Sequence, residues 1–223
     1  AASDVYKRQN DYLFTCFSGA FASIIVLIAT EVYKYIQVKK GIEQFLFTQL
    51  AFLYGQLQIA DRNINKLLSK DEEVACNLFD YLTFYLQQIL PQLRTIDYNP
   101  FIKTTQTSVI EQVIVRLFSE QISNLDTLGR ECIYLPIAIN TDKIEYLQEG
   151  INNPIVRTSS PNTNKVLITL QKIIRENMSQ LQMDISEINA VCNNRFHWAE
   201  TERNMSNVSV SDTSIESFLE RNM

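Results

Sequence analysis

The chain has 223 residues, of which 46% are hydrophobic and 20% are charged, an ordinary composition for a folded protein. Its five glycines and five prolines are few for a strand-and-turn architecture, which needs turn residues every ~8–12 positions, so long helices are favoured. The formal net charge of −5 provides no global basic surface, which argues against nucleic acid as a partner.

The first nine residues differ in kind from the rest of the chain. They read AASDVYKRQ, and the stretch from Asp4 to Gln9 resembles the in-frame translation of a transposon-adapter end used in sequencing libraries. We therefore expect residues 1–9 to be an assembly scar that takes no part in the fold. The charges of Lys7 and Arg8 are then discounted, and further segments are free to precede the visible chain.

A run of 19 residues without a charged side chain extends from Tyr12 to Thr30. As a helix it would span roughly 28 Å, close to the ~30 Å hydrocarbon core of a bilayer. Tyr12 at one end, with Tyr33 and Tyr35 beyond the other, matches an aromatic belt at the membrane interfaces. We predict a transmembrane anchor over residues 10–36. The alternatives are a buried core helix or a signal peptide, but the run is long for a signal peptide and no small-residue cleavage site follows it.

Three lysines, Lys34, Lys39 and Lys40, follow the apolar run, and we predict that they contact anionic lipid headgroups. With the scar discounted, basic residues flank the run only on its C-terminal side. The positive-inside rule then places residues 34 onward in the cytoplasm, attached to the cell membrane by a single visible span. Membrane lipid is thus the first predicted partner.

The whole sequence predicts an all-α protein: a transmembrane helix, an antiparallel helical bundle over residues 41–150 and a long C-terminal helix. The first bundle helix is expected over residues 42–68, either separate from the anchor or continuous with it through Gly41. Apolar residues recur there at alternating spacings of four and three: Leu46, Leu50, Leu53, Leu57, Ala60, Ile64 and Leu67.

The second bundle helix is expected to begin after Ser69, which forms a capping-box pattern with Glu72, and to run to about Leu93. Pro91 should end or kink it. A short connection between these two helices favours antiparallel neighbours.

Two further helices are expected before residue 151, over residues 105–128 and over Thr141 to Glu149. Gly129 is a candidate break after the first, although the helix could continue to Pro136. Gly150 is a standard stop for the second.

Residues 151–164 are rich in Asn, Pro, Ser and Thr and are predicted to be a linker or exposed loop. A long amphipathic helix over residues 165–200 is expected to pack on the bundle. Its apolar edge carries one stutter in the spacing and consists of Leu167, Leu170, Ile174, Met178, Leu181, Ile185, Ile188 and Cys192.

The tail over residues 201–223 is rich in Ser and Asn and is predicted to be mobile. Near its end, Ile215, Phe218 and Leu219 would share one side of a short capped helix. Two interpretations remain open, a frayed terminus and a C-terminal docking peptide.

The four cysteines, Cys16, Cys76, Cys132 and Cys192, stand 60, 56 and 60 residues apart. Zinc and redox motifs need close pairs, so this spacing favours buried reduced thiols. The single histidine, His197, is next to the only tryptophan, where capping or packing is a simpler role than catalysis. Glycine-rich phosphate loops are absent. We therefore predict no enzyme activity, no catalytic residues, no cofactor or metal site, and we identify no small-molecule substrate.

These features predict a membrane-anchored cytoplasmic helical protein that acts as a protein-interaction or scaffold module, with a protein partner or a second copy of itself. The alternative is a membrane effector or sensor of the toxin, stress or anti-phage type, whose helical domain controls the membrane segment. An enzyme with a site of scattered Tyr, Glu and Arg residues is a third and weaker hypothesis.

Overall fold

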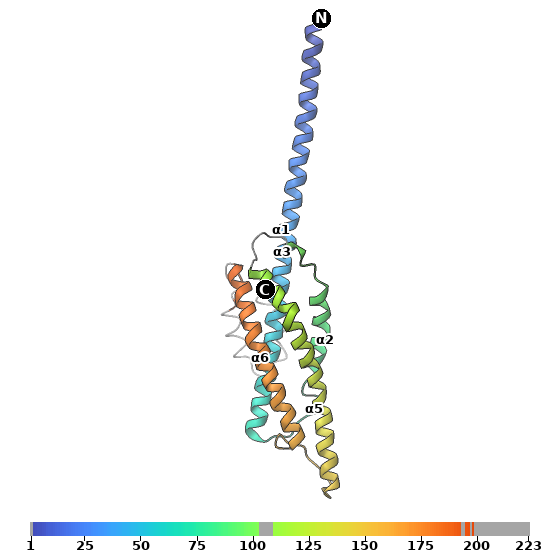
Figure 1. Cartoon of the computed structure of the whole chain (residues 1–223), viewed down its shortest axis with the longest axis vertical. Coiled ribbons are helices and arrows are strands. Elements are labelled where there is room, and N and C mark those ends of the chain that lie inside the picture. The colour runs from blue at the N-terminus through green and yellow to red at the C-terminus, as the bar shows by residue number, and fades with distance from the viewer. Residues whose placement is uncertain (1, 103–108, 193–194, 197, 199–223) are drawn as a thin grey trace. The chain divides into compact units, whose positions relative to one another are not determined.

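The computed structural model describes residues 2–102, 109–192, 195, 196 and 198, and every regular element among them is helical. The all-α prediction is therefore confirmed. The chain divides into two compact units, Ala1–Ile42 and Glu43–Met223. Helix α1 (Ala2–Lys70) contributes to both and continues through Gly41 without a break (Figure 1). The anchor and the first bundle helix are therefore one continuous helix and not two separate helices.

In the first unit, the described side chains of α1 are exposed from Tyr12 to Val38. The segment is long and apolar enough to cross a membrane, and none of its apolar window is buried within the protein. A core helix of a soluble domain would bury such a window, so the alternative of a buried core helix is not supported.

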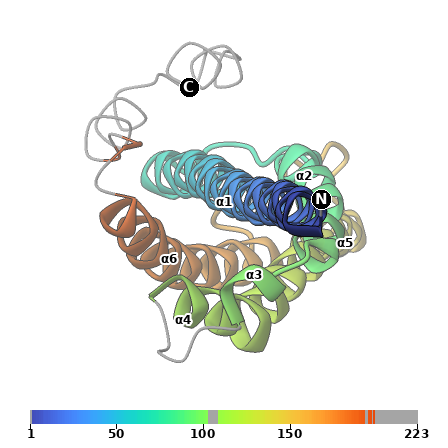
Figure 2. The ribbon, with the colours of Figure 1, turned by 90° about the horizontal axis from the view of Figure 1, so that it is seen from above.

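In the second unit, α1 is joined by five helical elements and a π-helical turn (Figures 1 and 2). They are α2 (Asp80–Thr95), α3 (Asn99–Ile102), α4 (Val109–Arg116), the π-helix η1 (Leu117–Gln121), α5 (Ile122–Gln148) and α6 (Pro161–Val191). The elements α4, η1 and α5 follow one another without a loop. Residues 109–148 therefore form one long helical arm of the bundle.

Contacts between side chains show which helices lie next to each other. Tyr85 of α2 donates a hydrogen bond to Gln49 of α1 (3.2 Å), and α5 packs against both α2 and α6. Arg175 of α6 pairs with Asp61 of α1 (2.7 Å). The bundle therefore closes in the order α1, α2, α5, α6, and its core contains the predicted apolar stripe of α1 from Leu46 to Ile64.

The predicted capping box at Ser69 is wrong. Ser69 lies inside α1, its hydroxyl donates to the Lys66 carbonyl (2.9 Å), and α2 begins only at Asp80. Asp71 instead ends α1 in the left-handed conformation (φ 50°), and its carboxylate accepts a hydrogen bond from the backbone N–H of Ser159 (3.1 Å). A partner distant in sequence, which a local pattern cannot show, thus decides where the helix stops.

The segment predicted to be a linker is a packed connection. The Val74 N–H donates to the Val156 carbonyl (3.1 Å), and the Thr158 N–H donates to the Glu72 carbonyl (3.2 Å). Val156 and Thr158 are buried, and α6 begins at Pro161, earlier than the expected Lys165. Polar side chains of the segment add further hydrogen bonds to the turn after α1, such as that from the Thr158 hydroxyl to Asp71 (3.2 Å).

Proline and glycine do not divide the helices as expected. Pro91 lies inside α2, while Gly129 and Pro136 lie inside α5. The described parts of the two predicted helices, residues 109–128 and 141–148, therefore belong to one arm. The buried side chains continue on both sides of these positions, and this tertiary burial outweighs the local cost of the breakers. Gly150, with φ 88°, does end α5, which confirms the predicted stop.

At its other end, α6 stops at Val191, before the predicted boundary at residue 200. The expectation of buried thiols is correct only for Cys132. Cys16 and Cys76 are exposed, Cys192 is half-buried, and none of these four described cysteines forms a disulfide bond.

Candidate functional site

The three lysines predicted to contact lipid headgroups all lie on α1. Lys34 is paired with Glu31 one turn earlier (2.9 Å), and both side chains are exposed. Lys40 is exposed and Lys39 is half-buried. The structure therefore places the three ammonium groups along one short stretch of helix, with Lys34 partly neutralised by its own neighbour.

The other predicted site residues, Ile215, Phe218 and Leu219, lie outside the described residues, and so does His197. The neighbouring Trp198 is described and is buried. Its ring meets those of Phe47 (centroids 6.0 Å apart) and Tyr54 (5.6 Å) edge-on.

A buried polar cluster joins α4, η1 and α6. Asp184 of α6 is fully buried and accepts hydrogen bonds at Oδ1 from Nη2 (2.7 Å) and Nε (3.0 Å) of Arg116. Arg116 also pairs with Glu187, and the amide of Gln121 donates to the second oxygen of Asp184. Burial raises the pKa of the Asp184 carboxyl, and the Arg116 guanidinium opposes that rise without cancelling it.

This polar cluster stands where the arm widens into the π-helix η1, and such turns occur frequently at functional sites. Gln121 is 2% exposed, and its Oε1 accepts no hydrogen bond from the residues that the structure describes. Nevertheless, the cluster holds no nucleophile or histidine, and the described residues contain no group of three or more side chains that could hold a metal ion. Its chemistry is that of an ion pair that fastens α6 to the long arm.

Sequence reasoning missed the polar cluster because its members are far apart in the chain. A signal was present, since Asp184 interrupts the apolar edge of α6 between Leu181 and Ile185. A carboxylate on a buried stripe needs a partner, and a cation on another helix is the usual one.

A second buried carboxylate, Asp142 of α5, holds the start of α6. It accepts hydrogen bonds from the backbone N–H (2.9 Å) and hydroxyl (2.5 Å) of Thr163 and from the backbone N–H (3.2 Å) and amide (2.9 Å) of Asn162. Burial alone would raise the pKa of Asp142, but these hydrogen bonds outweigh it and hold the pKa below its ordinary value. Asp142 thus supplies the cap that Ser160, at the N-cap position, does not provide.

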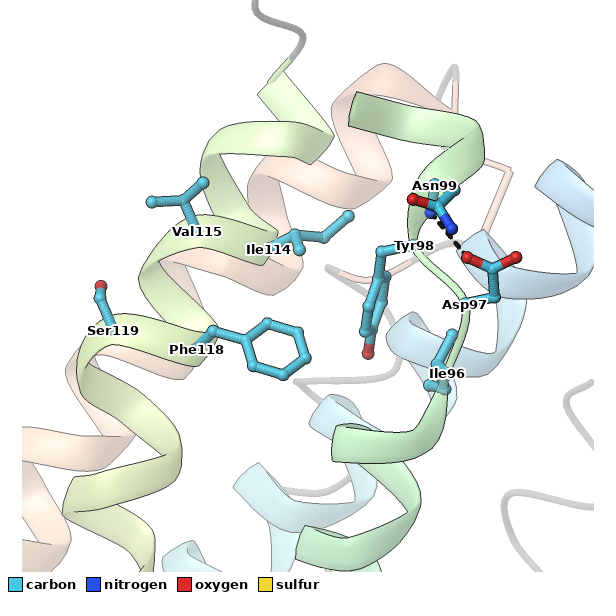
Figure 3. Close-up of a pocket in the computed structure, with 8 residues that line it drawn as sticks. All are labelled: Ile96, Asp97, Tyr98, Asn99, Ile114, Val115, Phe118 and Ser119. Atoms are coloured by element: carbon cyan, nitrogen blue, oxygen red, sulfur yellow. Dashed lines mark hydrogen bonds between the residues drawn. The ribbon is translucent and has the colours of Figure 1, made fainter. Parts of the chain in front are cut away.

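An open apolar pocket of about 620 Å³ lies between the turn after α2 and the long arm (Figure 3). Its walls are Ile96, Asp97, Tyr98, Asn99, Ile114, Val115, Phe118 and Ser119. The Tyr98 and Phe118 rings meet edge-on with centroids 5.2 Å apart, and the Tyr98 hydroxyl donates to the Leu93 carbonyl (3.0 Å). Burial raises the pKa of Tyr98, so its hydroxyl stays protonated. The pocket offers mainly apolar contact, and the Asp97 carboxylate at its wall accepts a hydrogen bond from the backbone N–H of Asn99 (3.0 Å).

Comparisons with protein-family models, with curated proteins and with solved structures found no match for this chain. The described residues offer an exposed apolar helix, an open apolar pocket and two buried carboxylates that hold helices together.

Proposed function

We propose that this chain is a membrane-anchored helical protein that acts as a protein-interaction or scaffold module, with its bundle on the cytoplasmic side of the cell membrane. The exposed apolar part of α1 carries the proposal. Nine large apolar side chains between Leu13 and Ile28 are 51–77% exposed. Each would gain roughly 1.5–3 kcal/mol from burial, which a bilayer supplies.

The sidedness follows from the flanking charges. Lys34, Lys39 and Lys40 come directly after the apolar segment, and basic residues near a span favour the cytoplasmic side. The same lysines would contact anionic lipid headgroups, each worth about 1 kcal/mol close to the surface.

An interaction role is supported by the surface of the bundle. Four apolar side chains on one face of α5 are at least 54% exposed, namely Ile133, Ile137, Ile144 and Leu147. A row of exposed apolar side chains supports docking of another protein or of a second copy of the same chain, with Asn140 as a polar interruption of the row. The two buried carboxylates are occupied by hydrogen bonds, which leaves little for acid–base chemistry among the described residues.

The second candidate is a membrane effector or sensor, and the continuity of α1 favours it. Because no loop separates the apolar segment from the bundle, a change in the bundle could be transmitted along the helix. Crosslinking and affinity purification from native membranes, together with a membrane-potential dye, distinguish the two. A stoichiometric partner with unchanged potential supports the module, whereas depolarisation on expression supports the effector.

The anchor is tested by a charge at its centre. We expect Phe21→Asp to move the protein out of the membrane fraction, because an aspartate at the middle of the Tyr12–Thr30 run opposes insertion by about 2.5–3.5 kcal/mol, or roughly a hundredfold in equilibrium. Carbonate extraction followed by immunoblotting measures the shift. Phe84→Asp, at an exposed position of α2, is the matched control and should stay with the membrane. Equal extraction of both variants and wild type would count against the anchor.

The sidedness is tested with Cys76, which is exposed and free. In a chain with Cys16 and Cys192 replaced by Ser, we expect a membrane-impermeant maleimide to label Cys76 only after cells are permeabilised. Cys132 serves as the internal control, because burial raises its pKa to about 12 and it should react only after unfolding. A cysteine introduced at Asn10 should show the opposite accessibility. Labelling of Cys76 in intact cells would reverse the proposed orientation.

A further inference from the structure

Beyond the end of α6, the chain turns back onto α1. Helix α6 stops at Val191, and the backbone N–H of Phe196 donates to the side-chain oxygen of Asn189 (3.1 Å), which fixes the turn. The described residues beyond the helix, Cys192, Arg195, Phe196 and Trp198, are called the strap here. These residues contact α1 between Glu43 and Tyr54, in the first turns of the bundle unit.

The strap is held chiefly by aromatic rings. Phe196 stacks on Phe47 with ring centroids 4.2 Å apart and an interplanar angle of 16°. Trp198, only 4% exposed, meets the rings of Phe47 and Tyr54 in nearly perpendicular contacts. Such pairs gain stability beyond their buried area, so the docked strap has a defined geometry.

The polar contacts of the strap are weak by comparison. Arg195 lies 3.9 Å from the Glu43 carboxylate and is 43% exposed, and the Cys192 thiol donates to the same carboxylate over 3.6 Å. The Trp198 Nε1–H is buried and finds no acceptor among the residues that the structure describes. Water would satisfy this N–H if the strap opened, so the docked state carries a cost that the open state does not.

We propose that the strap is a releasable latch: it fastens the end of α6 to the first bundle turns of α1, and it can open while the bundle stays folded. Opening removes the Phe196 and Trp198 rings from Phe47 and exposes the Phe47 ring. This regulatory element goes beyond the proposed function and does not depend on membrane anchoring.

Trp198 is the only tryptophan, so the intrinsic fluorescence of the full chain in detergent micelles reports on the strap alone. We expect wild-type Trp198 to be shielded from acrylamide. Phe47→Ala should shift its emission to longer wavelength and raise quenching towards that of the unfolded chain, while far-UV circular dichroism keeps its helical signal. Phe52→Ala is the matched control, because Phe52 is also a buried ring of α1 but contacts Tyr85 of α2 (4.7 Å). It should leave the emission unchanged.

Two results would overturn the latch: full quenching of Trp198 in the folded wild type, or unchanged quenching in Phe47→Ala. If Phe47→Ala fails to fold, hydrogen exchange of the wild type decides the matter. Local opening of Phe196 and the end of α6, faster than exchange of the α5 core, supports the latch. Exchange of both regions only through global unfolding rejects it.

Discussion

An Arg116→Met variant is expected to lose about 3–5 kcal/mol of unfolding free energy at neutral pH, because it leaves Asp184 buried without its cation. Asp184 has no exposed surface, and its Oδ1 accepts two hydrogen bonds from Arg116. Urea unfolding of the full chain in detergent micelles, followed by circular dichroism, measures the loss. The matched control is Arg130→Met, which removes an exposed pair with Asp126 on the surface of α5 and should cost under about 1 kcal/mol.

The sign of the pH dependence follows from the Asp184 carboxyl. Its pKa is already raised by burial while Arg116 is present, and removal of the guanidinium raises it further. When the folded pKa of a carboxyl exceeds its unfolded value of ~3.9, the folded state becomes less stable as pH rises from the unfolded pKa through the folded pKa. The deficit of Arg116→Met should therefore be largest at neutral pH and shrink as pH falls towards 4.

A rescue variant separates charge burial from packing. Arg116→Met combined with Gln121→Leu and Asp184→Leu replaces the ion pair and its amide donor by apolar side chains, which is often neutral or stabilising in a buried site. We expect most of the lost stability to return. If Arg116→Met costs no more than Arg130→Met, the polar cluster does not hold α6 to the long arm.

Much of the helix content could be predicted from the sequence because it follows from periodicity. Most of the apolar stripe of α1 and of the edge of α6 is buried where the spacing places it, although Leu67, Met178 and Cys192 are only half-buried. Gly150 stops α5 in the left-handed conformation that glycine favours. These are local properties of consecutive turns, so one sequence is enough to show them.

The helix ends were harder to predict because tertiary contacts decide them. Asp71 ends α1 with help from Ser159, a residue distant in sequence, and so the nearer pattern at Ser69 is not used. Pro136 is accommodated inside α5 because buried side chains continue beyond it. For the residues of the strap, the sequence predicts only the end of a helix, because a local pattern cannot show that their aromatic partners lie on α1.

The buried carboxylates of the candidate site were hard to predict from the sequence for the same reason. Asp142 was not singled out because Asp in a helix is ordinary, and only the fold brings it to the first turn of α6. Because Asp142 caps α6, its substitution is the second change for which we expect a large loss of unfolding free energy.

Asp142→Ala is expected to cost about 3 kcal/mol, because the backbone N–H groups of Asn162 and Thr163 and the Thr163 hydroxyl lose a charged acceptor in a buried place. Urea unfolding of the full chain in micelles measures the loss. Asp126→Ala, on the same helix but exposed, is the control and should stay within about 0.5 kcal/mol of wild type.

Asp142→Asn keeps the shape of the side chain and isolates its charge. The folded pKa of Asp142 lies below its unfolded value, so the carboxylate contributes stability above ~pH 3.9 and loses it as pH falls through the folded pKa. The difference between wild type and Asp142→Asn should therefore be constant near neutrality and vanish in acid. This window lies below the one expected for Arg116→Met, because one carboxyl has a lowered pKa and the other a raised pKa. If wild type and Asp142→Asn are equally stable at every pH, Asp142 caps α6 by shape alone. A difference that stays constant down to pH 2 would come from the amide group and not from the charge of Asp142.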